Sequence, residues 1–445
     1  MSHEHPDAAR RIAIQTFGCR LNQSDSEGMR AALLAAGHTI VSPRDTADIY
    51  VINTCSITGQ AEADARRAVR RAVERGAGGA RIVVTGCYAQ RAPAEVAALP
   101  GVELVVGNDR KTELPELIGE TSPSARTAVG DIGAVSAIAE FPVPLDTGRT
   151  RAYLRVQDGC EDRCTFCVVP ETRGGFRSLP VGRAVERLGE LVAAGYREIV
   201  LTGANLSSYG AERPDGPVLH DLLAALLTVP GDFRLRLSSF EPSDVTPELV
   251  ELLADAERLC RHLHLPAQSL DDGVLERMRR SYDAATVAAI ATRLRRRIPG
   301  LALGTDLMVG FPGESESAFQ TTRQRLESLP FTYFHVFPYS PRPGTAAGRE
   351  EDDVPREVKR RRSLELRELG SAKAAAFAGS QVGHPVRVLV ERSDASGQYL
   401  RGYTDNYLRV RVPADGGPTN RFVALELEPA HLETVQTGQV PGPSR

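Results

Sequence analysis

Apolar residues in the N-terminal part of the chain come in short runs that alternate with longer amphipathic stretches. The short runs are rich in Ile and Val, which predicts buried strands, and the amphipathic stretches predict helices. Strands and helices that alternate in this way are typical of a parallel sheet. We therefore predict a small parallel α/β domain over residues 10–120. The predicted elements are strands Arg11–Phe17, Asp48–Asn53 and Arg81–Thr85 and helices Ser26–Ala36 and Ala61–Arg75.

The alternation stops after residue 120 and resumes at residue 149. Residues 121–148 are rich in Ala, Ser, Pro and Thr and are predicted to be a linker. Residues 149–378 then carry six strand-like runs with helices between them, which predicts a partial (β/α)6 barrel like that of a TIM barrel. Such barrels carry their chemistry at the carboxyl ends of the strands. The predicted elements are strands Ala152–Gln157, Glu198–Thr202, Arg234–Ser238, His262–Leu265, Ala302–Val309 and Tyr333–Phe337, with helices such as Val181–Ala194 and Ala285–Arg297.

The last part of the chain changes pattern again. A charged helix is predicted over Arg356–Phe377, and residues 379–441 hold only short strand-like pieces separated by Gly, Asp and Pro. This pattern predicts a small all-β domain, either a barrel or a sandwich. The predicted strands are Val386–Val390, Leu408–Val412 and Phe422–Leu427.

Composition narrows the class of protein. No apolar run among the 445 residues approaches the roughly 20 residues that span a bilayer, and the polar N-terminus has no secretory signal, so we expect a cytoplasmic protein without membrane contact. Seven cysteines in this length do not make a disulfide scaffold and are more often metal ligands or catalytic groups. The net charge of −3 excludes an overall basic protein but allows a local basic patch.

Three cysteines form the run Cys160-x-x-x-Cys164-x-x-Cys167, directly after the first predicted barrel strand. Three thiolates on one short loop suit three irons of a [4Fe–4S] cluster and leave the fourth iron open. S-adenosylmethionine (SAM) is a ligand that an open iron would take and reduce. The alternative is a zinc site, but zinc sites usually pair Cys-x-x-Cys with a second distant pair, and none is present here.

Three further cysteines, Cys19, Cys55 and Cys87, each follow one of the three N-terminal strands. Parallel strands all point the same way, so these thiols emerge along one edge of the sheet, where α/β proteins bind ligands. We predict a second cluster there. The alternative is three unrelated buried thiols, since free Cys is often simply buried. Cys260 stands alone and is expected to be structural.

With these two triads the chain resembles the methylthiotransferase family of radical SAM enzymes over nearly all of its length. The family has an N-terminal domain with an auxiliary cluster, a radical SAM core and a C-terminal TRAM domain. The matching stretches include Phe17-Gly18-Cys19-Arg20-Leu21-Asn22, Asn53-Thr54-Cys55, Gly86-Cys87-Tyr88, Cys160 to Cys167 with Arg173-Gly174, Asp306 to Glu314, His335 to Thr345 and Gly402 to Tyr407.

The resemblance implies a two-part reaction that uses two [4Fe–4S] clusters and two molecules of SAM. One SAM donates a methyl group to a sulfur held at the cluster of Cys19, Cys55 and Cys87. A second is reduced at the cluster of Cys160, Cys164 and Cys167, and the resulting radical opens a C–H bond of the substrate for the methylthio group. Such a reaction needs an electron donor, such as flavodoxin or ferredoxin, and a sulfur donor.

Polar and glycine residues at the ends of later barrel strands are candidates for binding SAM. For each of them the alternative is ordinary capping or turn chemistry, and His264 suits a hydrogen-bonded core position equally well. The candidates are Thr202, Gly203, Asn205, Ser238, Ser239, Glu241, His264, Gln268 and Gly310.

The family acts on tRNA adenosines next to the anticodon or on an aspartate of a ribosomal protein. The run Gly18-Cys19-Arg20-Leu21-Asn22 looks like the branch that acts on N6-threonylcarbamoyladenosine at position 37. The alternatives are N6-isopentenyladenosine, the ribosomal protein aspartate and, from a different class, an iron–sulfur RNA-binding protein without turnover.

Basic residues beside the cysteines and in the last domain are candidates for binding the tRNA anticodon stem-loop. The helix over residues 61–75 carries a run of Arg that suits phosphates, and in the last domain Arg alternates with Tyr, which also suits unstacked bases. The alternative for the helix is a solvated face, and acidic residues dilute the patch in the last domain. The candidates are Arg66, Arg67, Arg70, Arg401, Tyr403 and Arg409.

Overall fold

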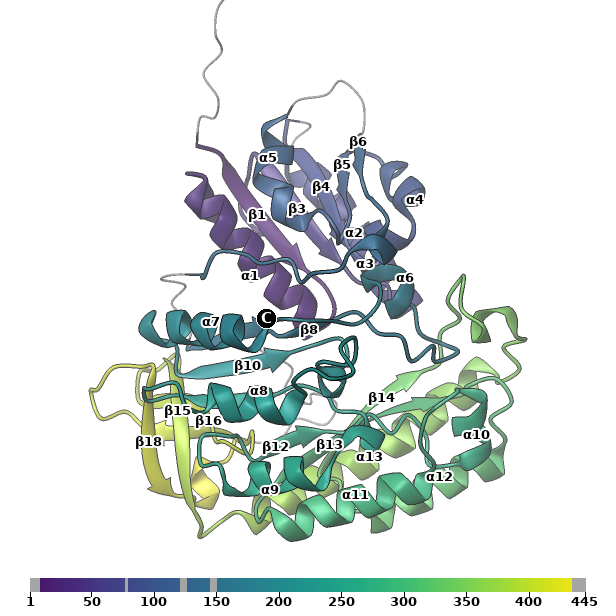
Figure 1. The fold of residues 1–445 in the computed structure, drawn as a ribbon, viewed down its shortest axis with the longest axis vertical. Coiled ribbons are helices and arrows are strands. Elements are labelled where there is room, and N and C mark those ends of the chain that lie inside the picture. Colours follow the sequence, from purple (N-terminus) through teal and green to yellow (C-terminus); the bar gives the residue numbers. More distant parts are fainter. Residues whose placement is uncertain (1–8, 77–78, 121–125, 145–149, 434–445) are drawn as a thin grey trace, which may run out of the picture.

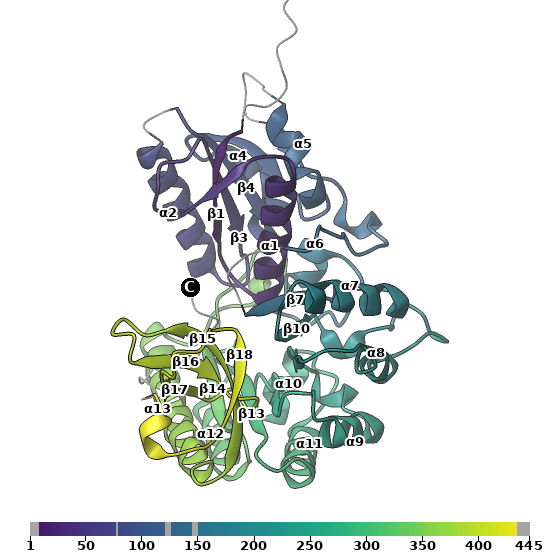
Figure 2. The ribbon, with the colours of Figure 1, turned by 90° about the vertical axis from the view of Figure 1, so that its left-hand side faces the viewer.

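The computed structural model describes residues 9–76, 79–120, 126–144 and 150–433. An N-terminal α/β part stands on a barrel, and a C-terminal β part packs beside the barrel (Figures 1 and 2). Across these residues, no helix has the length and apolar character that crossing a membrane requires.

The N-terminal part is a parallel sheet with strand order β2-β1-β3-β4-β5-β6. Both faces of β3 are covered, because Ile49 and Val51 pack with α1 and α5 while Tyr50 and Ile52 pack with α2, α3 and α4. The elements are β1 (Arg11–Thr16), α1 (Arg20–Ala35), β2 (Thr39–Val41), β3 (Ile49–Thr54), α2 (Gly59–Arg75), β4 (Arg81–Gly86), α3 (Cys87–Arg91), α4 (Pro93–Ala97), β5 (Val102–Val106), α5 (Leu114–Gly119) and β6 (Arg126–Ala128).

Two features of this part differ from the sequence prediction. Helix α1 begins at Arg20 rather than Ser26, because its first turns bury polar residues such as Asn22 and Asp25 and so lack the apolar period. Residues Arg126–Ala128 pair with β5 as an edge strand, so this part of the predicted linker belongs to the sheet instead. Residues 121–125 and 145–148 of that linker lie outside the described residues.

The central part has the predicted six parallel barrel strands. They form the sheets β11-β10-β7 and β12-β13-β14, which single bridges Leu235–Leu259 and Ser239–His264 join into one curved wall. The strands are β7 (Arg151–Arg155), β10 (Glu198–Thr202), β11 (Arg234–Leu237), β12 (His262–His264), β13 (Ala302–Val309) and β14 (Tyr333–Pro338), with a small pair β8 (Gln157–Asp158) and β9 (Arg177–Ser178). The helices are α6 (Val169–Arg173), α7 (Val181–Ala193), α8 (Leu219–Leu226), α9 (Pro247–Asp255), α10 (Asp272–Arg277), α11 (Ala284–Arg297), α12 (Glu316–Ser328) and α13 (Arg356–Ser380).

The hydrophobic core of this part lies between the barrel strands and the helices that surround them. Ile199 and Leu235 pack there, so their neighbours Glu198, Arg234 and Arg236 point inward. Glu198 accepts from Arg234 Nε at 2.7 Å and from Arg236 Nε at 2.7 Å, and all three side chains are buried. The base of the barrel is therefore filled by charged groups that satisfy one another.

The C-terminal part is an antiparallel sheet with strand order β17-β16-β15-β18. It docks on the base of the barrel, where Arg234 donates to the carbonyl of Tyr403 at 3.0 Å and Arg236 to that of Asp405 at 2.9 Å. The sequence prediction missed β16, whose residues Arg401 and Gly402 hide its apolar alternation. The strands are β15 (Pro385–Ser393), β16 (Tyr399–Tyr403), β17 (Arg409–Pro413) and β18 (Arg421–Glu426).

Candidate cluster and cofactor sites

Three strand ends of the N-terminal sheet bring Cys19, Cys55 and Cys87 to one edge. Cys19 is the N-cap residue of α1, Cys55 directly follows β3, and Cys87 begins α3. Burial raises the pKa of the Cys19 and Cys55 thiols, and the neighbouring Cys87 thiol raises both further. The three thiols thus lie close enough to act on one another.

Two glycines allow the cysteine loops to approach this closely. Gly18 has a φ of +93°, and a Cβ there would lie 2.7 Å from the Sγ of Cys55. Gly86 has a φ of +98°, and a Cβ there would lie 2.3 Å from the carbonyl oxygen of Thr54. Any other residue would be strained at both positions and would push the loops apart.

Amide side chains hold the cysteine loops in place. Asn22 Nδ2 donates to the carbonyl oxygen of Thr54 at 2.8 Å, and its Oδ1 accepts from Arg173 at 2.8 Å. Asn108 Nδ2 lies 3.7 Å from the Sγ of Cys87. The cysteine edge is therefore connected to Arg173, which lies on α6 directly after the other cysteine loop.

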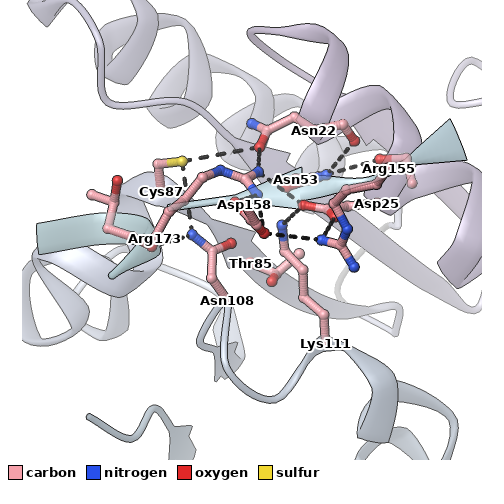
Figure 3. Close-up of polar contacts among 12 residues, drawn as sticks. Asn22, Asp25, Asn53, Thr85, Cys87, Asn108, Lys111, Arg155, Asp158 and Arg173 are labelled. Carbon is pink, nitrogen blue, oxygen red and sulfur yellow. Dashed lines mark hydrogen bonds and ion pairs between the residues drawn. The ribbon is translucent and has the colours of Figure 1, made fainter. Parts of the chain in front are cut away.

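A buried ionic network joins this edge to the barrel (Figure 3). Arg173 contacts both oxygens of Asp158 at 3.1 Å and Asp25 at 3.0 Å. Asp25 also accepts from Lys111 at 2.6 Å and from Arg155 at 2.7 Å. Each of these five side chains is at most 9% exposed. The buried Arg177 also lies 3.8 Å from Asp158, so the cations outnumber the two carboxylates and leave excess positive charge beside the thiols.

The residues at this edge fit an iron–sulfur cluster held by thiolates. The positive charge of Arg173 opposes the rise in pKa that burial imposes on Cys19 and Cys55. Among the described residues, the buried Oγ1 of Thr85 and Oδ1 of Asn108 have no hydrogen-bond partner. Binding of a metal cluster must displace the thiol protons, and a buried cation favours the anionic ligands that result.

The second triad lies on the loop between β8 and α6. Arg280 donates to the Sγ of Cys164 at 3.0 Å, and the backbone N–H of Val169 to the Sγ of Cys167 at 3.4 Å. Burial raises the pKa of Cys167 to about 12, and it also raises the pKa of Cys160. Positioned donors to two of the three sulfurs are what a thiolate-bound cluster requires.

Several predicted SAM-binding residues gather at the carboxyl ends of β10 and β11, next to this loop. Asn205 Nδ2 donates to Asp162 at 3.0 Å, and Asp162 in turn lies 3.1 Å from the Sγ of Cys160. Within the part of the chain that the structure describes, the buried hydroxyls of Thr202 and Ser238 lack partners. Unpaired buried hydroxyls beside a cluster loop fit a polar cofactor that supplies the missing contacts.

The candidates Gly203, Ser239 and Glu241 lie at the same strand ends. A Cβ at Gly203 would be 2.7 Å from the Oε1 of Gln157, so close packing requires this glycine. Ser239 is partly exposed, and Glu241 pairs with Arg280. Arg280 therefore connects a cluster sulfur with a carboxylate at the end of β11.

The remaining candidates lie farther round the barrel. His264 Nε2 donates to the carboxylate of Asp306 at 2.9 Å, and His335 Nδ1 lies 3.1 Å from the same oxygen. Gln268 has a φ of +62°, and its N–H donates to the carbonyl of Asp306 at 2.8 Å. Gly310 packs under Lys359, where a Cβ would be 2.3 Å from that side chain, so internal packing accounts for this glycine.

The predicted RNA-binding residues fall into two groups. On α2, Arg66 donates to the hydroxyl of Tyr88 at 3.1 Å, while Arg67 and Arg70 are exposed. In the C-terminal sheet, Arg401 and Arg409 are partly exposed and face Glu433.

Tyr403 does not suit the role of an open platform for a base. Its ring stacks on Tyr407 and lies 4.5 Å from the guanidinium of Arg151, and the residue is 6% exposed. It is part of the contact between the C-terminal sheet and the barrel, so the sequence prediction for this residue was wrong.

Comparison with known proteins now identifies the family. Residues 11–107 match the model "Uncharacterized protein family UPF0004", and residues 154–326 match "Radical SAM superfamily". The chain is 37% identical over 404 residues to threonylcarbamoyladenosine tRNA methylthiotransferase MtaB of Bacillus subtilis, covering 90% of this chain and 89% of that one. The chain belongs to the radical SAM methylthiotransferases. As such an enzyme it uses an iron–sulfur cluster and SAM.

Two further relatives are similar to this chain over most of its length. MtaB of Aquifex aeolicus is 36% identical over 90% of this chain and 96% of its own. The tRNA-2-methylthio-N(6)-dimethylallyladenosine synthase of Sorangium cellulosum is 39% identical over 86% of this chain and 82% of its own. The solved structure of the radical SAM methyltransferase TsrM from Kitasatospora setae has a TM-score of 0.58 at 15% identity, covers 77% of each chain and supports the fold.

Sequence reasoning missed the charged residues that connect the two triads. Arg173 lies six residues after Cys167, and a cation so close to a cluster loop is a signal that could have been used. Asp25 and Lys111 gave no such signal, because 86 residues separate them along the chain. Arg280 is likewise 116 residues from Cys164.

Proposed function

We propose that the enzyme inserts a methylthio group at C2 of N6-threonylcarbamoyladenosine at position 37 of tRNA, next to the anticodon. One observation supports this proposal most strongly. The two cysteine triads lie at facing strand ends, and Arg173, on the helix that follows one cysteine loop, contacts Asn22 beside the other triad. The reaction of this family replaces the hydrogen of a C–H bond with a methylthio group, so both cysteine triads must be within reach of one substrate. The names of the MtaB relatives and the run Gly18 to Asn22 support the choice of base.

We further propose two [4Fe–4S] clusters. Cys160, Cys164 and Cys167 would hold one and leave an iron for SAM, and the edge formed by Cys19, Cys55 and Cys87 would hold the other. When bound, these groups supply the radical that opens a C–H bond and the sulfur that replaces the hydrogen.

The chain's own side chains orient these groups. Arg280 donates to Cys164 and opposes the rise that burial causes in the pKa of this thiol, and the unpaired hydroxyls of Thr202 and Ser238 would bind SAM. Arg173 fixes the spacing of the two loops. The proposed partners are the tRNA anticodon stem-loop, which Arg66, Arg67, Arg70, Arg401 and Arg409 would contact, an electron donor such as flavodoxin or ferredoxin, and a sulfur donor.

The second candidate substrate is N6-dimethylallyladenosine, because a synthase of that class is 39% identical to this chain. Mass spectrometry of tRNA nucleosides from cells that lack the gene separates the two. We expect 2-methylthio-N6-threonylcarbamoyladenosine to disappear and the dimethylallyl product to persist. Unchanged 2-methylthio-N6-threonylcarbamoyladenosine would refute the proposed substrate.

Iron analysis tests the second cluster. A variant with Cys19, Cys55 and Cys87 all changed to Ala should fall from about eight irons to about four, since each site would hold four. It should still cleave SAM, whereas Cys164→Ala should not. Equal iron content in the triple variant and the parent would exclude the second site.

A further inference from the structure

The N-terminal part bridges the open edge of the barrel between β7 and β14. On the β7 side, the hydroxyl of Tyr153 donates to Gln23 of α1 at 2.6 Å. On the β14 side, the backbone N–H of Gly59 donates to Ser340 at 3.1 Å. Among the residues that the structure describes, no strand joins β7 to β14, so the cysteine edge lies over a barrel interior that is open between these two strands.

A cation begins helix α1 beside this opening. Arg20 is the first residue of α1 and is partly exposed. Across the described ranges, no carboxylate or hydrogen-bond acceptor pairs with it. Burial raises the pKa of Tyr333 on β14 and of Tyr153 on β7, and the charge of Arg20 opposes both rises. Arg20 also lies three residues before Gln23, whose side chain contacts β7, so the two residues share one face of α1.

An aromatic side chain is exposed on the wall of the same opening. Phe334 and Val336 of β14 pack outward in the core, so Tyr333, His335 and Phe337 face inward. Phe337 is 45% exposed although it is large and apolar, and its ring centroid lies 6.4 Å from that of His335. An exposed aromatic ring at the end of a barrel strand suits an unstacked base.

We propose that Arg20 binds the carboxylate of the threonylcarbamoyl group on N6 of the target adenosine, while Phe337 stacks on its base. This inference rests on the proposed function and deepens it. The threonylcarbamoyl group ends in a carboxylate, and the dimethylallyl group is an uncharged hydrocarbon. A planar guanidinium forms paired, charge-assisted hydrogen bonds with a carboxylate and gains nothing from a hydrocarbon. Arg20 is therefore a specificity-determining residue.

The position of Arg20 couples this recognition to the chemistry. It follows Cys19 directly, so a base whose N6 substituent reaches Arg20 lies beside the edge of the three cysteines. N6 is attached to C6, and C6 and C2 flank N1 in the same six-membered ring. A single anchor on the substituent therefore also limits how C2 can point.

Binding of anticodon stem-loops to the reconstituted enzyme tests the proposal without relying on turnover. Three RNAs are compared by fluorescence anisotropy: one with N6-threonylcarbamoyladenosine, one with its methyl ester and one with N6-dimethylallyladenosine. The parent enzyme should bind the free acid about tenfold to a hundredfold more tightly than the ester, as expected for a charged hydrogen bond. Arg20→Met should bind all three alike, and Arg20→Lys should keep part of the preference.

Two controls accompany these variants. Arg360→Met removes an exposed arginine from α13 and should leave all affinities unchanged. Phe337→Ala should weaken all three RNAs by about tenfold, because stacking does not depend on the N6 substituent. Iron content is measured for every variant, so that loss of a cluster at the neighbouring Cys19 is not mistaken for loss of recognition.

Retention of the acid-over-ester preference in Arg20→Met with full iron content would overturn the proposal. A parent enzyme that binds acid and ester equally would overturn it as well. Neither result would contradict the proposed function, which the nucleoside analysis of tRNA tests separately.

Discussion

Replacing Arg173 with Met removes a side chain that contacts the N-terminal part and the barrel at the same time. Its guanidinium makes two contacts of 3.1 Å to Asp158, one of 3.0 Å to Asp25 and one of 2.8 Å to Asn22. Breaking a buried ion pair by removing one partner costs about 3–5 kcal/mol. Asp25 keeps Lys111 as a partner, so we expect the lower end, about 3 kcal/mol.

Urea unfolding of the cluster-free protein measures this cost without interference from iron. The matched control is Arg183→Met, whose ion pairs with Glu140 and Glu186 lie on the surface and should contribute less than about 1 kcal/mol. In the reconstituted protein, Arg173→Met should also lose iron to a chelator faster than the control variant. Unfolding of Arg173→Met at the same urea concentration as the control would refute the account of the network.

Two further predictions concern the barrel base and a cysteine loop. Burial alone would raise the pKa of Glu198, but Arg236 and Arg234 outweigh it and hold the pKa well below its ordinary value. The stabilisation from Glu198 is thus present above about pH 4.3 and is lost as the pH falls further. The melting temperatures of Glu198→Gln and the parent should therefore differ at pH 7 and converge in acid. A difference in melting temperature that stays constant with pH would contradict this. Gly86→Ala should lower the free energy of unfolding by more than about 1 kcal/mol, because its Cβ would meet the carbonyl of Thr54, whereas Gly182→Ala, with open space around it, should not.

Much of the fold could be predicted because the buried strands are short apolar runs. Strands β3 and β4 lie within a residue of their predicted bounds, since both faces of each are covered and nothing polar interrupts them. The pattern failed where burial was polar. The first turns of α1 were missed because their buried charged and amide side chains are satisfied by partners far away in sequence, whereas β16 was missed because Arg401 and Gly402 hide its apolar alternation.

The candidate site, like the fold, could be predicted in part from the sequence. Cysteine spacing predicted which cysteines lie together, because residues on one loop or after neighbouring parallel strands are close in the fold. The groups that tune these thiols could not be found in this way. Arg280 reaches Cys164 across 116 residues, and Arg173 reaches Asn22 across 151, so only the folded chain places them together.

Helix α1 explains why so many polar residues are buried at one place. Its first turns contribute Cys19 as cap, Gln23 to β7 and Asp25 to the buried network. A hinge motion that lifted the N-terminal part would expose Asp25 and its cations at once and would cost several kcal/mol. The two triads are therefore held at a fixed separation. A substrate must therefore reach both triads without separation of the two parts.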